Sequence, residues 1–97
     1  MKYKSRVDET TEYECLGEII CIRRGGESWS FPLDMLPEKS ERLKEPIRRE
    51  LSGVAAAYKI MRGKKKVGLD LAAEVGKMLG ISYGEVQTRR LKGELII

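Results

Sequence analysis

Two groups of side chains in the second half of the sequence have the chemistry needed to bind a polyanion. Three consecutive lysines stand at Lys64, Lys65 and Lys66, and ammonium groups of this kind bind phosphate oxygens. The second group mixes hydrogen-bonding and cationic side chains, namely Ser82, Gln87, Thr88, Arg89, Arg90 and Lys92. Such side chains contact base edges as well as phosphates. We therefore predict nucleic-acid binding, with the lysines on phosphates and the second group near a groove.

The net charge of +4 is spread unevenly along the chain. Residues 1–38 hold five Lys or Arg and eight Asp or Glu, a net charge of −3. Residues 39–97 hold fourteen Lys or Arg and seven Asp or Glu, a net charge of +7. This positive charge can act on a phosphate backbone. A lysine-rich surface that only contacts water is the alternative, and lysines at a helix end also stabilise the helix dipole. The sequence leaves both explanations open.

The remaining reactive side chains form no recognisable catalytic or metal site. The chain has no histidine and two cysteines, Cys15 and Cys21. On one extended strand they would lie about 20 Å apart, beyond the ~6 Å that a disulfide tolerates, so we expect free thiols and no zinc site. Residues 80–84 fit the pattern of a nucleophile elbow, which needs a histidine base. Residues 63–66 lack the flanking residues of a phosphate-binding loop. We expect no enzyme activity, no metal and no cofactor.

Length and patterning predict a single domain of the α+β class over residues 1–97. The expected parts are a loose arm (1–11), a β-hairpin (12–36), a basic helical part (45–93) and a tail strand that can join the hairpin (94–97). In the hairpin, residues 13–23 are apolar and β-branched, as in one buried strand. Gly25 and Gly26 indicate the turn, and because Pro32 lacks an amide donor the alternating second strand is an edge strand or ends there.

Three helices are predicted in the basic part. They begin after Pro46, Asp70 and Ser82 and end near Gly63, Gly80 and Gly93. Apolar residues recur at three- and four-residue steps between Ile47 and Met61, which is typical of a helix with one buried stripe. Asp70 is the expected cap of the second helix, and Ser82 with Glu85 has the spacing of a capping box.

Residues 71–93 resemble a helix-turn-helix. That family has a small residue in the first helix, a glycine four positions later in the turn, and a β-branched anchor six positions beyond. Gly76, Gly80 and Val86 keep this spacing. Arg89 departs from the pattern, since the family has an apolar residue three positions after the anchor. The resemblance implies that the second helix lies in the major groove of DNA with its early residues at base edges.

A weaker resemblance covers some of the same residues. The order of features from residue 82 onward is similar to that of the S4-type RNA-binding domain. These features are Ser82 and Glu85, then a basic helix, Gly93 and an apolar strand. That family has apolar residues where Arg89 and Arg90 stand. The helix-turn-helix is favoured, so DNA is the preferred partner over RNA.

We interpret the chain as a small DNA-binding regulator that forms a homodimer. It has no apolar run long enough to cross a membrane and no signal-like N-terminus, so we expect no membrane partner and a cytoplasmic location. A different class of function is also open: a protein-interaction or homo-oligomeric structural subunit. This alternative is motivated by Trp29, Phe31 and the apolar tail, because an edge strand beside apolar residues favours pairing with another chain.

Overall fold

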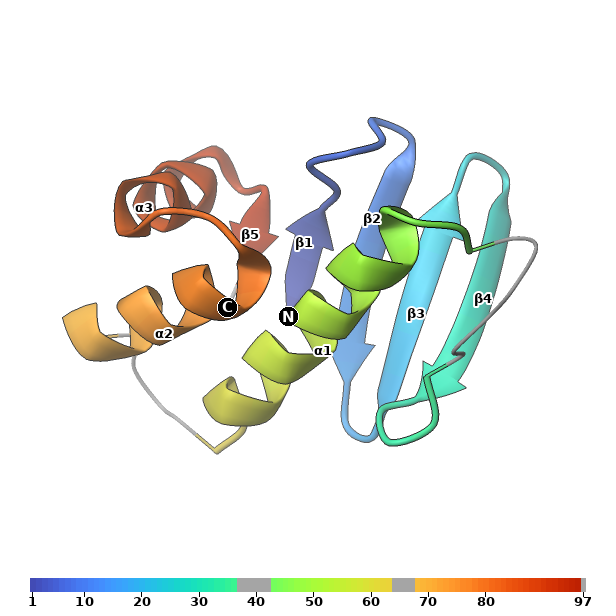
Figure 1. The fold of residues 1–97 in the computed structure, drawn as a ribbon, viewed down its shortest axis with the longest axis horizontal. Helices are drawn as coiled ribbons and strands as arrows, with labels where there is room; N and C mark the ends of the chain where they lie inside the picture. Colours follow the sequence, from blue (N-terminus) through green and yellow to red (C-terminus); the bar gives the residue numbers. More distant parts are fainter. Residues whose placement is uncertain (37–42, 64–67, 97) are drawn as a thin grey trace.

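The computed structural model describes residues 1–36, 43–63 and 68–96. Its elements follow the chain as β1 (Lys2–Lys4), β2 (Thr11–Leu16), β3 (Ile19–Arg24), β4 (Glu27–Pro32), α1 (Ile47–Met61), α2 (Leu69–Leu79), α3 (Tyr83–Lys92) and β5 (Leu95–Ile96). The strands come first, three helices follow, and a short strand returns to the sheet (Figure 1). The predicted α+β class is confirmed.

Within the described residues, the strands form one antiparallel sheet in the order β4-β3-β2-β1-β5. The expectation of a loose arm over residues 1–11 was wrong for its first part, because β1 lies inside this sheet. Tyr3 faces Tyr13 on one side and Leu95 on the other, and it is almost fully buried. The tail strand joins the sheet as expected, but it pairs with β1 rather than with the hairpin.

The strand predicted over residues 13–23 is two strands. Gly17 adopts a left-handed conformation with φ 57°, which glycine reaches at little cost, and the chain reverses there. Cys15 therefore lies on β2 opposite Ile20, and Cys21 lies on β3 opposite Glu14. Both thiols are free, as expected, although the argument from a shared strand was mistaken. The next reversal falls at residues 25–26, as predicted.

Helix α1 crosses one face of the sheet and covers its buried side chains (Figure 1). Trp29 and Phe31 pair with Ile22 and Ile20 on that same face and are half-buried. The C-terminal end of α1 is tied to the β2–β3 turn, because the Tyr58 hydroxyl donates a 3.0 Å hydrogen bond to the Gly17 carbonyl. The opposite face of the sheet carries the charged and half-exposed residues, among them Glu12, Glu14, Cys21 and Arg23.

The helix ends follow the predicted signals at most positions. The Ser82 hydroxyl accepts a 3.1 Å hydrogen bond from the Glu85 amide, and Gly80 and Gly93 end α2 and α3 in the left-handed conformation. Asp70 was the wrong cap: α2 begins two residues earlier than expected, its cap is Gly68, and Asp70 lies in its first turn. A carboxylate in the first turn still stabilises the helix dipole.

Candidate nucleic-acid interface

Helices α2 and α3 form a tightly packed pair joined by the three residues 80–82. Gly80 has φ 73°, which reverses the chain, and buried Ile81 donates its amide hydrogen to the Gly76 carbonyl at 2.9 Å. Val86, the first buried residue of α3, is fully covered. The turn is thus held by backbone hydrogen bonds and by an apolar contact beneath it.

Two glycines let the helices approach closely. A Cβ atom on Gly76 would lie 2.9 Å from the Ile81 carbonyl oxygen and 3.1 Å from a methyl group of Val86. On α1, a Cβ atom on Gly53 would lie 2.6 Å from the Met78 carbonyl oxygen. Both contacts are too short for a real side chain, so the packing requires glycine there. Sequence analysis identified Gly76 but missed Gly53, because the contact that requires Gly53 is made with Met78 on another helix.

One face of α3 is turned away from the rest of the described structure. Its exposed residues are Tyr83, Gly84, Thr88, Leu91 and Lys92, and we call this set the outward face of α3. Leu91 is 89% exposed, so nothing in the described part of the chain covers the C-terminal end of this face. The Lys92 side chain has no ion-pair partner among the described residues. A helix presented in this way can enter a groove of a duplex.

Arg89 lies on the inward side of the same helix. Its guanidinium carbon is 4.9 Å from the centre of the Tyr3 ring, and one of its nitrogens donates a 2.7 Å hydrogen bond to the Lys4 carbonyl. It also pairs with Glu85 at 3.7 Å, and only 9% of the residue is exposed. The prediction that Arg89 approaches a groove requires an exposed guanidinium, which this placement does not provide. Arg89 instead occupies the buried position where a helix-turn-helix has an apolar residue.

Four of the predicted site residues make local contacts along α3 or at its start. The Gln87 amide nitrogen donates to the Tyr83 hydroxyl at 3.2 Å, and its oxygen accepts from Arg90 at 3.1 Å. The Thr88 hydroxyl donates to the Gly84 carbonyl at 2.9 Å. Ser82 is engaged in its cap. Gln87 and Arg90 are half-buried beside the outward face, so their polar groups border it.

The lysines Lys64, Lys65 and Lys66 lie outside the described residues. Their place between α1 and α2 is known from the sequence alone, and the phosphate contacts predicted for them stay a prediction. The described site residues thus include one exposed cation, Lys92, and the half-buried Arg90.

Sequence analysis also missed Arg6. This residue lies between β1 and β2, far from α2 in the sequence, and it donates a 2.9 Å hydrogen bond to the Gly80 carbonyl at the end of α2. Its own backbone amide donates to Glu50 of α1 at 2.8 Å. No local signal marks Arg6, because both partners are brought to it by the tertiary fold.

Other kinds of site find little support. Among the described residues, no group of three or more histidine, cysteine or acidic side chains could hold a metal ion. Burial raises the pKa of the Cys15 thiol to about 11, which disfavours the reactive thiolate. The Cys21 sulfur lies 3.1 Å from the Ser30 hydroxyl on the other face of the sheet.

Comparison with protein-family models, with curated proteins and with solved structures gave no match to this chain. None of the helices in the described ranges is long and apolar enough to cross a bilayer.

Proposed function

We propose that this protein binds nucleic acid, with DNA as the preferred partner, and that it acts as a small DNA-binding regulator. The observation that carries the proposal is the outward face of α3. It belongs to a helix that follows a three-residue turn, its residues are exposed in the described structure, and it combines a hydroxyl, an aromatic ring and an ammonium group.

The interface differs from the one that the sequence predicts. Thr88 and Lys92 lie on the outward face of α3, and Gln87 and Arg90 lie beside it. Arg89 instead anchors the helix through its hydrogen bond to the Lys4 carbonyl. Tyr83 is added, since an exposed tyrosine at the start of the helix can contact bases or phosphates. Lys64, Lys65 and Lys66 supply three further cations close to α2 in the sequence.

The test is fluorescence anisotropy with labelled duplex DNA and single-stranded RNA of mixed sequence at several salt concentrations. We expect duplex binding whose log–log dependence on salt has a slope of roughly 0.9 per phosphate contact. Preferential binding of the RNA would favour the S4-like alternative. Failure to bind either probe at low salt, where electrostatic attraction is strongest, would reject the proposal.

A second function is favoured by the sheet. Strand β4 is the last strand in the sheet order, and Leu16 and Ile19 are 62% and 48% exposed on the face away from α1. Edge strands and exposed apolar residues both favour association with another chain. Under this alternative the chain is a homo-oligomeric or protein-interaction subunit. Size-exclusion chromatography with light scattering tests it, and a monomer at high concentration would reject the homo-oligomer.

A further inference from the structure

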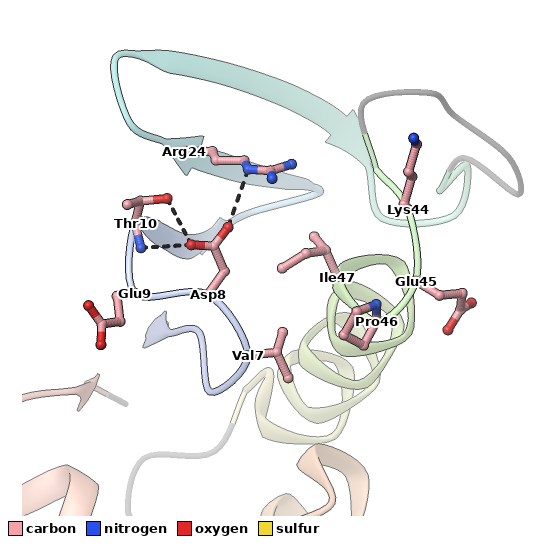
Figure 2. A pocket seen from close by; sticks show the side chains of 9 residues that line it. All are labelled: Val7, Asp8, Glu9, Thr10, Arg24, Lys44, Glu45, Pro46 and Ile47. Atoms are coloured by element: carbon pink, nitrogen blue, oxygen red, sulfur yellow. Dashed lines mark hydrogen bonds and ion pairs between the residues drawn. The ribbon is translucent and has the colours of Figure 1, made fainter.

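The pocket between the β1–β2 connection and the start of α1 is lined by three carboxylates and two cations (Figure 2). Asp8 accepts hydrogen bonds from the Thr10 amide and hydroxyl at 3.0 and 2.9 Å and pairs with Arg24 at 3.3 Å. This pocket therefore has no surplus of positive charge. The cationic group at Arg90 differs, because in the described part of the chain its guanidinium forms no ion pair with an acidic side chain.

A row of hydrogen-bonded side chains runs along α3 beside its outward face. Tyr83, Gln87 and Arg90 are four and three residues apart, so they lie on one stripe of the helix. The Gln87 Nε2 donates to the Tyr83 hydroxyl at 3.2 Å, and the Arg90 Nη1 donates to the Gln87 Oε1 at 3.1 Å. Tyr83 is 41% exposed, and the other two residues are half-buried. We call these three residues the polar row of α3.

The chemistry of arginine fixes the orientation of the Gln87 amide. A guanidinium group has donors and no acceptor, so the Gln87 atom that faces Arg90 must be the oxygen. The amide nitrogen then faces Tyr83 and donates to its hydroxyl oxygen. This contact leaves the hydroxyl hydrogen of Tyr83 unused, and Arg90 keeps further N–H groups beyond the one that contacts Gln87. The polar row therefore presents hydrogen-bond donors at both of its ends.

The two purines differ in the groups that they present in the major groove. Guanine presents two acceptors, O6 and N7, and the arginine fork can donate to both. Adenine presents the acceptor N7 and the donor N6, and a glutamine recognises it with both polar atoms of its amide. In the polar row those two atoms of Gln87 are already engaged by Tyr83 and Arg90. The arrangement thus favours guanine through Arg90 and disfavours adenine through Gln87.

We propose that the polar row of α3 selects guanine in the major groove of duplex DNA. Arg90 donates to the O6 and N7 atoms of guanine, and Gln87 is a positioning residue that holds the guanidinium. Tyr83 donates its hydroxyl hydrogen to a neighbouring phosphate. The preference rests on the nucleic-acid binding proposed above, and it adds the class of base that this helix recognises.

The polar groups of the outward face that lie outside this row do not discriminate between the purines. The Thr88 hydroxyl donates its hydrogen to the Gly84 carbonyl at 2.9 Å, which leaves an oxygen that accepts from the amino group of either cytosine or adenine. The Lys92 ammonium is a phosphate contact in the function proposed above. A preference for guanine is therefore a specific sign of Arg90.

Fluorescence anisotropy at fixed salt measures the preference with two duplexes of equal length, one of G·C pairs and one of A·T pairs. We expect the G·C duplex to bind about tenfold more tightly, as is usual for one bidentate base contact. Replacing its guanines by 7-deazaguanine removes the N7 acceptor and should weaken binding about fivefold. Inosine is the matched control, because it keeps O6 and N7 and lacks only the minor-groove amine. It should bind like guanine.

Two variants and a control assign the preference to residues. Arg90→Lys keeps the positive charge and removes the fork, so the preference should fall below about twofold while the log–log salt slope stays unchanged. Arg49→Lys, at an exposed arginine of α1, should keep the full preference. Gln87→Met removes the bond that positions Arg90 and should reduce the preference about threefold, with affinity for the A·T duplex unchanged.

The outcomes separate the guanine preference from the function on which it rests. Equal affinity for the two duplexes, each with a normal salt dependence, would overturn the preference and leave DNA binding standing. A full preference retained in Arg90→Lys would overturn the assignment to Arg90. Binding to neither duplex at low salt would reject the preference and the proposed function together.

Discussion

The inward and outward faces of α3 each carry a basic side chain, and these two side chains have different environments. Arg89 is buried against the Tyr3 ring and the Lys4 carbonyl, whereas Lys92, one turn later, is exposed. The buried arginine fixes the helix on the sheet, and the exposed lysine is available to a partner. Basic residues in a sequence therefore do not by themselves mark an interface, because burial decides whether a cation stabilises the fold or meets a phosphate.

The largest effect is expected where the helix pair packs most closely. Gly76→Leu forces a side chain against the Ile81 carbonyl and Val86, and overpacking of this kind should lower the free energy of unfolding by about 3 kcal/mol. Urea denaturation followed by circular dichroism measures the loss. Gly84→Ala is the matched control, since its Cβ would meet only the Ser82 hydroxyl at 3.9 Å. Similar losses in both variants would contradict the close packing.

The comparison of the two faces is tested directly by Arg89→Met against Lys92→Met. Arg89→Met removes the ring contact, the hydrogen bond to Lys4 and the pair with Glu85, and should destabilise the protein by about 2 kcal/mol. Lys92→Met should change stability by less than ~0.5 kcal/mol, as is usual for an exposed residue. Equal unfolding free energies would mean that Arg89 does not anchor the helix.

A smaller effect, on binding alone, is expected for Lys92→Ala. It should weaken binding to all duplex sequences alike and lower the log–log salt slope by roughly 0.9, the value for one lost phosphate contact. Anisotropy titrations at several salt concentrations measure both quantities. A change in sequence preference without a change in slope would show that Lys92 reads bases instead.

The smallest expected effect is a difference in the alkylation rates of the two thiols. The raised pKa of Cys15, about 11, leaves on the order of one thiolate in a thousand at pH 8, so its alkylation should be slow in the folded protein. Cys21, half-buried on the other face of the sheet, should react first. Mass spectrometry after iodoacetamide treatment identifies the modified residue. Faster labelling of Cys15 would contradict its burial.

The features that sequence analysis predicted correctly are those with local causes. The cap at Ser82 and the left-handed glycines at Gly80 and Gly93 depend on neighbours within a few residues. The alternation of Trp29 and Phe31 likewise follows from strand geometry.

The features that it missed depend on contacts between distant parts of the chain. Strand β1 is stabilised by pairing with β5, close to the other terminus, and three residues are too few to show a pattern. Arg89 has the sequence appearance of a DNA contact, and its burial depends on the Tyr3 ring and the Lys4 carbonyl, which come from the other end of the chain. The same holds for Arg6, whose partner carbonyl belongs to Gly80.

The central claim is that the outward face of α3 meets nucleic acid. NMR titration of the ¹⁵N-labelled protein with a mixed-sequence duplex at low salt tests it most directly. We predict shifts at Gly84, Thr88 and Lys92, with little change at Glu12 and Cys21 on the sheet face opposite α1. Shifts concentrated on that sheet face, or none at all, would contradict it.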